Sequence, residues 1–561
     1  MNIQFQHANP RSGRESLILR FEGLLADQTV CVLVDAGADV DTTTLLDEDA
    51  GEYLTAICLT HAHLDHYQSL GANLDHGPPI YTGVDTARIL EDVLETGREH
   101  HGLTRTEEVL DRLEPVATWM QIAPGLRVHP VPAGHTPGAI GFLFEVTDND
   151  VRRTILVTGD FTTRRAAGYP GFALDLPVDV DTLVLTAATN DEFEPTLTDA
   201  IGTILERARA GSTVLATASG LTGVHIAYLL GHLTDQWDDQ LPITLVGHAA
   251  KLYESLEYSI PNVTSVPEFT APSDVLTAGG VTIAGPEVPV GGSSQRLFET
   301  ILNDPGATLV QLTSGASDPL SSAACTTHHF TLSNHPTSDT IDAVVDAFAP
   351  IQTIITHQQG AAANQYKDKY ASFVWATDDT DCYTVLDDAG WTPPPWVTDK
   401  TTRRVRAAAT TNRSLLTNGS VKLECSLPTA TRCDNVDLPA EGLDLEQLRA
   451  RIPPQPEPQL SNGATETATT PAETNSEPQS PADTETAETQ PIEQSLAAID
   501  ERLDRIESAV TTQELTAQVV DAGDGTILLR LEDPPEDLEH GQQLRVCLSD
   551  YGLDTDAVTD Q

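Results

Sequence analysis

The chain has 561 residues and a formal net charge of −53, from 84 acidic and 31 basic residues. Its length provides for roughly three or four domains of ordinary size, and its charge excludes a protein that is basic over its whole surface. Because the acids lie in segments with clear apolar periodicity, the composition is typical of adaptation to a high-salt cytoplasm. In such a cytoplasm salt screens the repulsion between the acidic side chains, because the Debye length is only about 3 Å at 1 M ionic strength. The alternative, an acidic and partly disordered chain, fits part of the C-terminal tail.

The seven cysteines are odd in number, scattered, and contain no CxxC pair. This pattern argues against a disulfide framework and against a cysteine-based zinc ribbon. The N-terminus lacks an apolar signal core, and no stretch of about 18 apolar residues occurs. We therefore expect a soluble, cytoplasmic protein without a membrane segment.

The N-terminal part alternates short apolar strands with helical patterns, which indicates an α/β fold. Helices are predicted at residues 84–95 and 106–113. Strands are predicted at residues 30–34, 56–59, 126–131, 140–146, 154–157 and 183–185.

A second α/β pattern follows, in which strands alternate with helices as in a parallel sheet built from βαβ units. Strands are predicted at residues 213–216, 243–246 and 308–312, and helices at 196–210, 223–233, 249–258 and 294–302. A helix at 338–348 and a strand at 353–356 come after it.

The character of the chain changes near residue 400. Residues 453–491 are rich in Pro, Glu, Thr and Ser, and too poor in apolar residues to offset the entropy of ordering, which predicts a disordered acidic linker. In residues 492–510 apolar side chains recur at alternating intervals of four and three. That seam indicates a short coiled coil (492–512) and a homo-oligomer, or a helix packed on its own chain. Residues 513–561 are expected to form a small β module, with strands at 526–531 and 543–548.

The run THAHLDH at residues 60–66 follows a predicted strand, in a position where rigid sheets commonly hold metal sites. His61 and His63 can point the same way and bind one metal ion, while Asp65 and His66, on the next turn, can bind a second. Imidazole and carboxylate suit Zn²⁺, and two ions about 3.5–4 Å apart can hold a bridging hydroxide. The run therefore predicts a site for two zinc ions.

Three further residues follow other predicted strands in the same way. His135 lies in AGHTPGAIGF, and Asp160 lies in TGDF, where its carboxylate can bridge both metal ions. Asp35 lies in VDAG and suits a carboxylate that orients the histidine-rich loop. Singly, such motifs are often only turns, but their order and shared placement at strand ends support one site.

These motifs resemble, in the same order, those of the metallo-β-lactamase superfamily. The resemblance implies an αββα sandwich with a two-zinc site at one edge. Members hydrolyse lactams, thioesters and phosphodiesters, so the fold alone does not fix the substrate.

Three later stretches resemble the β-CASP nuclease group, which includes RNase J and the endonuclease subunit of the mRNA 3′-end cleavage machinery. They are GSTVLATASGLTGVHIAYLL, ITLVGHAAKLYESLEY and GGSSQRLFETILNDPGATLVQL. This likeness, over about residues 1–370, implies a metallo-β-lactamase domain at 1–190 and 331–400, interrupted by a β-CASP-like insertion at 191–330. The nature of an extension at 401–452 stays open.

The resemblance also implies roles for single residues. His357 would complete the second zinc site, and His335, in Ser-x-His, would contact the scissile phosphate or protonate the leaving oxygen. Asp65, His335 and Asp35 are the predicted catalytic residues. Arg14, Ser293 and Ser294 are the residues expected to bind substrate.

One departure concerns the acidic residue that the family places straight after the strand ending near Leu185. Residues 186–189 read TAAT, and Asp191 and Glu192 come a few positions late. The missing acid would normally orient a catalytic histidine, so its loss could weaken activity, shift the role to Asp191, or mark a specialised relative.

The leading hypothesis is a zinc-dependent ribonuclease that uses a hydroxide held by two zinc ions and acts on RNA or single-stranded nucleic acid. Nucleic-acid binders usually carry a basic surface, and a local rim is a candidate here, although such charges are often only solvated. Its residues would be Arg11, Arg14, Arg164, Arg165, Lys251 and Arg296. Two alternatives stay open: a catalytically weak scaffold that binds RNA or an active paralogue, and a hydrolase of small esters or thioesters.

Overall fold

The computed structural model describes residues 1–149, 151–416, 427–452, 517–521 and 527–531. They belong to two compact units, Met1–Pro458 and Gln459–Gln561. In the second unit β22 (Ala517–Asp521) pairs antiparallel with β23 (Ile527–Leu531), which overlaps a predicted strand. The predicted linker, coiled coil and strand at 543–548 lie outside the described residues.

An eight-stranded sheet forms one half of a sandwich in the first unit, with the order β21-β20-β1-β2-β3-β4-β5-β6. Its strands are β1 (Asn2–His7), β2 (Leu17–Glu22), β3 (Thr29–Val34), β4 (Glu52–Leu59), β5 (Ile80–Gly83), β6 (Leu113–Val116), β20 (Tyr383–Asp387) and β21 (Gly390–Trp391). The strands β1 and β2 are absent from the prediction. In β1 four of the six residues are polar, and only Ile3 and Phe5 are apolar. The helix predicted at 106–113 ends at Asp111, since Leu113 pairs with Ile80 as the start of an edge strand.

A seven-stranded sheet packs face to face on the first, with the order β19-β18-β11-β10-β9-β8-β7. Its strands are β7 (Met120–Ala123), β8 (Leu126–Pro132), β9 (Ile140–Asp148), β10 (Val151–Val157), β11 (Thr182–Thr186), β18 (Gln352–Thr356) and β19 (Phe373–Trp375). Alternate side chains of a strand point to opposite faces. Thus Phe142 and Phe144 of β9 enter the core between the sheets, while Leu143 packs in the outer core on the other face.

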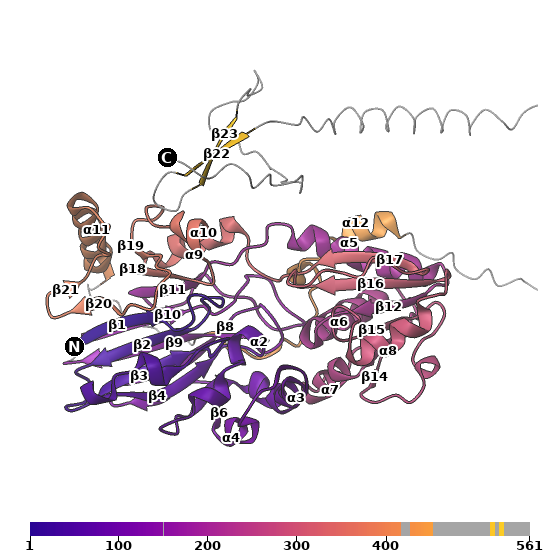
Figure 1. Cartoon of the computed structure of the whole chain (residues 1–561), viewed down its shortest axis with the longest axis horizontal. Coiled ribbons are helices and arrows are strands. Elements are labelled where there is room, and N and C mark those ends of the chain that lie inside the picture. The colour runs from indigo at the N-terminus through magenta and orange to yellow at the C-terminus, as the bar shows by residue number, and fades with distance from the viewer. Residues whose placement is uncertain (150, 417–426, 453–516, 522–526, 532–561) are drawn as a thin grey trace, which may run out of the picture. The chain divides into compact units, whose positions relative to one another are not determined.

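Helices cover the outer faces of both sheets (Figure 1). The helix α3 (Val84–His101) buries Ile89, Leu90, Val93 and Leu94 against the first sheet. The helix α9 (Ser338–Phe348) buries Ile341, Val344 and Val345 against the second. Short helices α1 (Thr42–Leu45), α2 (Leu64–Tyr67), α4 (Thr106–Asp111) and α10 (Gly360–Asn364) complete this part. The result is an α/β sandwich with mixed sheets, consistent with the predicted αββα arrangement.

An extra α/β domain is inserted between two neighbouring strands of the second sheet. The chain leaves after β11 and returns in β18, where Leu183 pairs with Thr353. The inserted sheet is parallel throughout, with the order β14-β13-β15-β12-β16-β17. Its strands are β12 (Thr213–Thr217), β13 (Ile243–Val246), β14 (Val263–Val266), β15 (Val281–Ala284), β16 (Ala307–Thr313) and β17 (Thr326–Thr331). Its helices are α5 (Phe193–Arg209), α6 (Gly220–Gln236), α7 (His248–Ser255) and α8 (Gly292–Ile301).

After β21 come α11 (Asp399–Leu416) and then residues 427–452, which we call the C-terminal strap and which end in α12 (Leu445–Arg451). The strap contacts both domains. The Arg432 guanidinium donates to the carbonyl oxygen of Leu256 in the insertion. The amide of Arg165, in the sandwich, donates to the carbonyl oxygen of Ala440 at 2.8 Å. Within the described part of the chain, no helix has the length and apolar character needed to cross a lipid bilayer.

Two valines of β10 provide a matched test of the sandwich core. Val157 is 4 % exposed and packs between the sheets, whereas Val151, at the other end of the strand, is 47 % exposed. We expect Val157→Ala to lower the free energy of unfolding by about 2 kcal/mol, because it removes buried methyl groups and leaves a cavity. Val151→Ala should change it by less than about 0.5 kcal/mol. Denaturant unfolding of the full chain measures both, and equal losses would contradict the assigned packing.

Candidate metal centre

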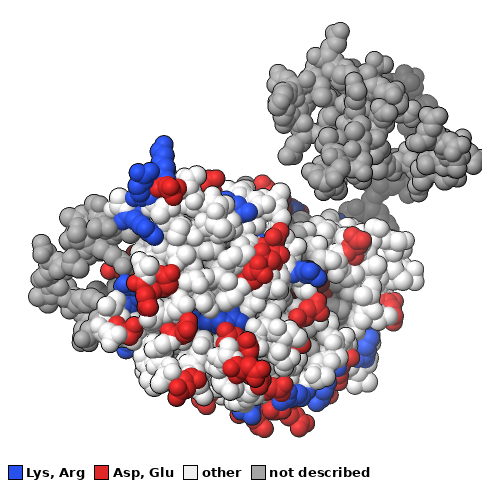
Figure 2. Space-filling view, turned by 60° about the vertical axis from the view of Figure 1, so that its left-hand side comes forward, with Lys and Arg blue, Asp and Glu red and all other residues white. Residues whose placement is uncertain are grey.

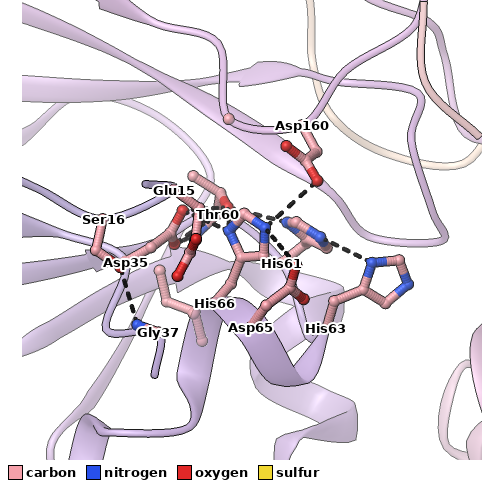
Figure 3. A network of polar contacts seen from close by, with 12 residues as sticks. Glu15, Ser16, Asp35, Gly37, Thr60, His61, His63, Asp65, His66 and Asp160 are labelled. Carbon is pink, nitrogen blue, oxygen red and sulfur yellow. Dashed lines mark hydrogen bonds and ion pairs between the residues drawn. The ribbon is translucent and has the colours of Figure 1, made fainter. Parts of the chain in front are cut away.

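The predicted ligands all follow the carboxyl ends of strands. Asp35 follows β3, the run at 60–66 follows β4, His135 follows β8, Asp160 follows β10 and His357 follows β18. The strands β8, β10, β11 and β18 point the same way, so their ends meet at one edge of the second sheet. The loops after β3 and β4 reach the same place from the first sheet, and their polar network is shown in Figure 3.

One group of nitrogens comes from His61, His63 and His135. The Nδ1 atom of His63 lies 3.1 Å from Nε2 of His61 and 3.1 Å from Nε2 of His135. The Nδ1–H of His135 donates to the carbonyl oxygen of Asn334 at 2.6 Å, which leaves Nε2 with a free lone pair. Burial lowers the pKa of His61 and His135 well below the usual value, so both rings are neutral, the form that binds metal.

A second group consists of Asp65, His66, Asp160 and His357. The Asp160 Oδ2 atom lies 3.4 Å from His66 Nε2, and Asp160 Oδ1 accepts a hydrogen bond of 2.9 Å from His357 Nδ1. Asp65 Oδ2 is 3.8 Å from His66 Nε2 and 3.9 Å from His357 Nε2. Because Asp160 Oδ2 also lies 3.7 Å from His135 Nε2, this carboxylate stands between the two groups, as predicted for a bridging ligand.

The second group is strongly coupled electrostatically. Burial alone would lower the pKa of His66 and His357, but the nearby carboxylates outweigh it. They raise the pKa of His66 well above its usual value, chiefly through Asp35, and that of His357 to about 9, chiefly through Asp160. Burial would raise the pKa of Asp160, yet these imidazoles hold it well below its ordinary range. Without metal, protonated histidines therefore supply the positive charge that the carboxylates need.

Asp35 supports the histidine loop through hydrogen bonds to Thr60 and His66. Its carboxylate accepts hydrogen bonds from the amide of Thr60 at 2.8 Å and from Nδ1 of His66 at 2.8 Å, and it is 1 % exposed. Since it reaches the side of the His66 ring away from Asp160, it orients the histidine loop, in line with the predicted supporting role. These contacts place Asp35 as a positioning residue that acts through His66.

Glu15 and Gly37 belong to the same network but were not predicted (Figure 3). Gly37 is required by close approach, since a Cβ atom there would lie 2.1 Å from the carbonyl oxygen of Asp65. Burial raises the pKa of Glu15 to about 7. Glu15 precedes a strand that the sequence pattern did not reveal, so nothing marked it as a neighbour of the histidine loop.

His335 enters the site on the connection that returns from the inserted domain. Its ring centroid lies 5.0 Å from that of His135 and 5.7 Å from that of His357. Burial lowers its pKa to about 4. The loop is fixed by Arg164, which donates to the carbonyl oxygen of His335 at 2.8 Å, and by the amide of Asn190, which donates to the carbonyl oxygen of Pro336 at 2.9 Å.

The missing acid is not replaced by Asp191. Its carboxylate accepts hydrogen bonds from the backbone amide of Ser338 at 2.7 Å and from the Ser338 hydroxyl at 3.2 Å, at the start of α9. Correspondingly, Nδ1 of His335 is buried without a hydrogen-bond partner among the described residues. The histidine is held by its backbone rather than by a carboxylate.

The substrate-binding roles predicted for Arg14, Ser293 and Ser294 do not fit their positions. Arg14 is fully buried, and its guanidinium donates to the carbonyl oxygens of Gln358 and Thr377. Ser293 and Ser294 lie in the first turn of α8, and Ser294 is fully buried. The arginine therefore supports the loop that carries His357, and neither serine lines the cavity described below.

A cavity of about 650 Å³ opens onto the centre and is walled by both domains. The sandwich contributes ligands, including His63, Asp65 and Asp160, and the insertion contributes much of the opposite wall. The insertion residues are Phe193, Leu197, Ser219, Leu221, Thr222, His225, Ile226, Glu287, Ser314 and Ala316. No Lys or Arg is among the residues that line this cavity.

The donor set fits two metal ions. The nitrogens of His61, His63 and His135 lie within 4.8 Å of one another, and so do donor atoms of His61, His66 and Asp160. The buried Nε2 of His66 lacks a hydrogen-bond partner within the described residues. Neutral imidazole nitrogens that face one another in a buried space are stabilised by a cation, and imidazole with carboxylate is the ligand type of zinc and similar metals.

Comparison with known proteins agrees with this geometry. Residues 23–193 match the family model of the metallo-beta-lactamase superfamily. An uncharacterized protein of Synechocystis, sll0514, is 31% identical over 148 residues, which are 26% of this chain and 24% of that protein. The DNA cross-link repair protein pso2/snm1 of Schizosaccharomyces pombe is 28% identical over 106 residues, 19% of this chain and 17% of that protein.

A solved structure of a protein of unknown function from Enterococcus faecalis aligns with a TM-score of 0.46 and 14% identity, over 64% of this chain and 94% of that one. The matched segments span a quarter or less of the two curated relatives. Residues 23–193, which match the family model, include two groups of histidine and aspartate side chains that could hold metal.

Replacement of Asp35 tests the support of the histidine loop. Asp35→Asn should weaken metal affinity roughly 10- to 100-fold, because the amide can no longer accept from both Thr60 and His66 as a carboxylate does. Asp39→Asn is the matched control, since Asp39 is exposed on the same loop and accepts from Ser12. Competitive titration with a chromogenic chelator measures both, and an unchanged affinity in Asp35→Asn would overturn the positioning role.

Proton release tests the charge state of the second group. A pKa of about 9 means that His357 is protonated at pH 7 in the metal-free protein, and a ligand must lose its proton to bind metal. Metal binding should therefore release protons at pH 7, and affinity should rise with pH up to about 9. Calorimetry in two buffers of different ionisation enthalpy reports the release. His357→Ala should release fewer protons, and heats that do not depend on the buffer would refute the assignment.

Proposed function

We propose that this chain, with its metallo-β-lactamase domain, is a metal-dependent hydrolase that cleaves phosphodiester bonds in nucleic acid. The single observation that supports the proposal is the position of His335. The return connection of the inserted domain places this partly buried imidazole beside His135 and His357, in the cavity that both domains share. A substrate bound there contacts the metal centre, His335 and the inserted domain together.

Some residues of the site would bind metal, and His335 would contact the substrate. His61, His63 and His135 would hold one ion, and Asp65, His66 and His357 the other, with Asp160 between them. When bound, two ions such as zinc would supply Lewis-acid polarisation of the phosphoryl group and activate water. Neutral His335 has one N–H, which it can donate to a phosphoryl oxygen where negative charge develops. The complete ligand set favours an active enzyme over the scaffold alternative.

The similarity to a DNA cross-link repair protein also supports nucleic acid as the substrate, over the short segment that the two share. The surface charge limits how a nucleic acid can bind. On the face shown in Figure 2 acidic and basic side chains are interspersed, without a continuous basic stripe. Binding of the scissile phosphate must then rely on the metal centre more than on Lys and Arg.

A second candidate is a hydrolase of small uncharged esters or thioesters. The observation that favours it is the same cavity lining, which offers hydroxyl, imidazole and apolar groups but no Lys or Arg. Its volume of about 650 Å³ suits a small molecule as well as a short piece of a polymer. The two candidates differ in whether hydrolysis requires a phosphodiester.

Cleavage assays decide between them. The full chain, purified in multi-molar KCl and loaded with zinc, should cleave end-labelled RNA or single-stranded DNA. Asp160→Ala should lose both metal and activity. His335→Ala should keep its metal and lower kcat roughly 100-fold or more, as expected for loss of a group that stabilises the transition state. His329→Ala is the control, because His329 is exposed on β17 and bonds Thr313. Hydrolysis of a 4-nitrophenyl carboxylic ester, with no cleavage of nucleic acid, would reverse the order of the two candidates.

A further inference from the structure

One face of α6 forms part of the cavity wall opposite the metal ligands. Ser219, Thr222 and His225 recur every three residues and line the cavity, together with Leu221 and Ile226. Residues at this spacing share one side of a helix. The face therefore presents two hydroxyls and an imidazole between apolar side chains, and it carries no Lys or Arg.

His225 is held in place by a carboxylate from the C-terminal strap. Glu441 is fully buried, and its Oε2 atom accepts from Nε2 of His225 at 2.8 Å and from the amide of Ala167 at 2.7 Å. Its Oε1 atom accepts from the amide of Gly168 at 2.8 Å. Three donors fix the carboxylate, which in turn fixes the imidazole with a proton on Nε2.

This arrangement determines which hydrogen-bonding atom of His225 is available to a molecule bound in the cavity. A ring whose single N–H is the Nε2–H donated to Glu441 keeps a lone pair on Nδ1. No group in the described part of the chain hydrogen-bonds that atom. His225 also lines the cavity, which a tether between the strap and the inserted domain would not require.

Building on the proposed function, we propose that this α6 face is a subsite for the nucleoside portion of the substrate. His225 Nδ1 accepts a hydrogen bond from an N–H or O–H group of the base or sugar. The hydroxyls of Ser219 and Thr222 can bond other polar edges, and Phe193, Leu221 and Ile226 can contact the flat ring. The lack of Lys and Arg suits an uncharged group at this wall, while phosphate lies at the metal centre.

Two phosphodiesters that differ only in the nucleoside test the subsite on the zinc-loaded full chain. One is the 4-nitrophenyl ester of thymidine 5′-monophosphate, and the other is bis(4-nitrophenyl) phosphate. His225→Ala should raise KM for the thymidine ester about tenfold, the loss expected for one neutral hydrogen bond, with kcat within about twofold of the parent value. Hydrolysis of the second ester should be unchanged.

Three further variants separate substrate contact from structural support. His225→Asn can place an acceptor near the Nδ1 position and should restore part of the affinity. In Glu441→Gln the amide nitrogen cannot accept from a backbone N–H as the carboxylate does, so the imidazole is held less firmly and KM for the thymidine ester should rise. His232→Ala, which removes a ring that packs on Tyr228 of the same helix, should change nothing. Thermal unfolding verifies that each variant is folded at the assay temperature.

The outcomes are decisive in each case. Equal losses on both esters would show a catalytic or structural role and overturn the subsite, and so would no loss on either. If the parent protein hydrolyses neither ester, the proposed function fails by itself. The subsite is then judged by calorimetric binding of thymidine 5′-monophosphate to the metal-free chain. Binding that weakens about tenfold in His225→Ala, the loss of one neutral hydrogen bond, supports it; no binding to the parent protein overturns it.

Discussion

The carboxylate of Asp160 is the interaction on which the rest of the centre depends. It is 2 % exposed and meets His66, His357 and His135, which come from three different loops. A buried charge is tolerated only when it is paired. The two-sheet sandwich provides that pairing, because several strands end at one edge and each end delivers one side chain. The fold therefore concentrates imidazoles and carboxylates in a space where only a cation or protons can balance them.

Much of this centre could be predicted from the sequence because each ligand follows a short apolar strand. His61, His135 and Asp160 needed no knowledge of tertiary structure beyond the rule that strand ends gather at an edge. The supporting residues did not carry such a signal. Glu441 lies 216 positions from His225, and Arg14 is an ordinary charged residue in a polar segment. Contacts over such separations depend on how domains pack, which local periodicity does not report.

The strands of the fold likewise divide into those that the sequence predicted and those that it did not. Strands with apolar runs, such as β3 and β13, were predicted to within one residue of their observed ends, while β1 was missed because four of its six residues are polar. The missing acid after β11 illustrates a different limit. The sequence showed Asp191 as a possible replacement, but only the structure shows that this carboxylate is engaged at the start of α9. Composition and chain order identify candidates, and geometry decides which of them share a site.

The insertion between β11 and β18 has an evolutionary consequence. These strands are hydrogen-bonded neighbours, and the amide of Asn190 on the outgoing connection bonds the carbonyl oxygen of Pro336 on the returning one. The two chain connections between the inserted domain and the sandwich thus lie side by side, in a register fixed by the sheet. The predicted metal ligands all lie on the sandwich side of these connections. The metal ligands and the opposite wall of the cavity therefore come from separate stretches of the chain, so either stretch can vary in sequence without a direct change in the residues of the other.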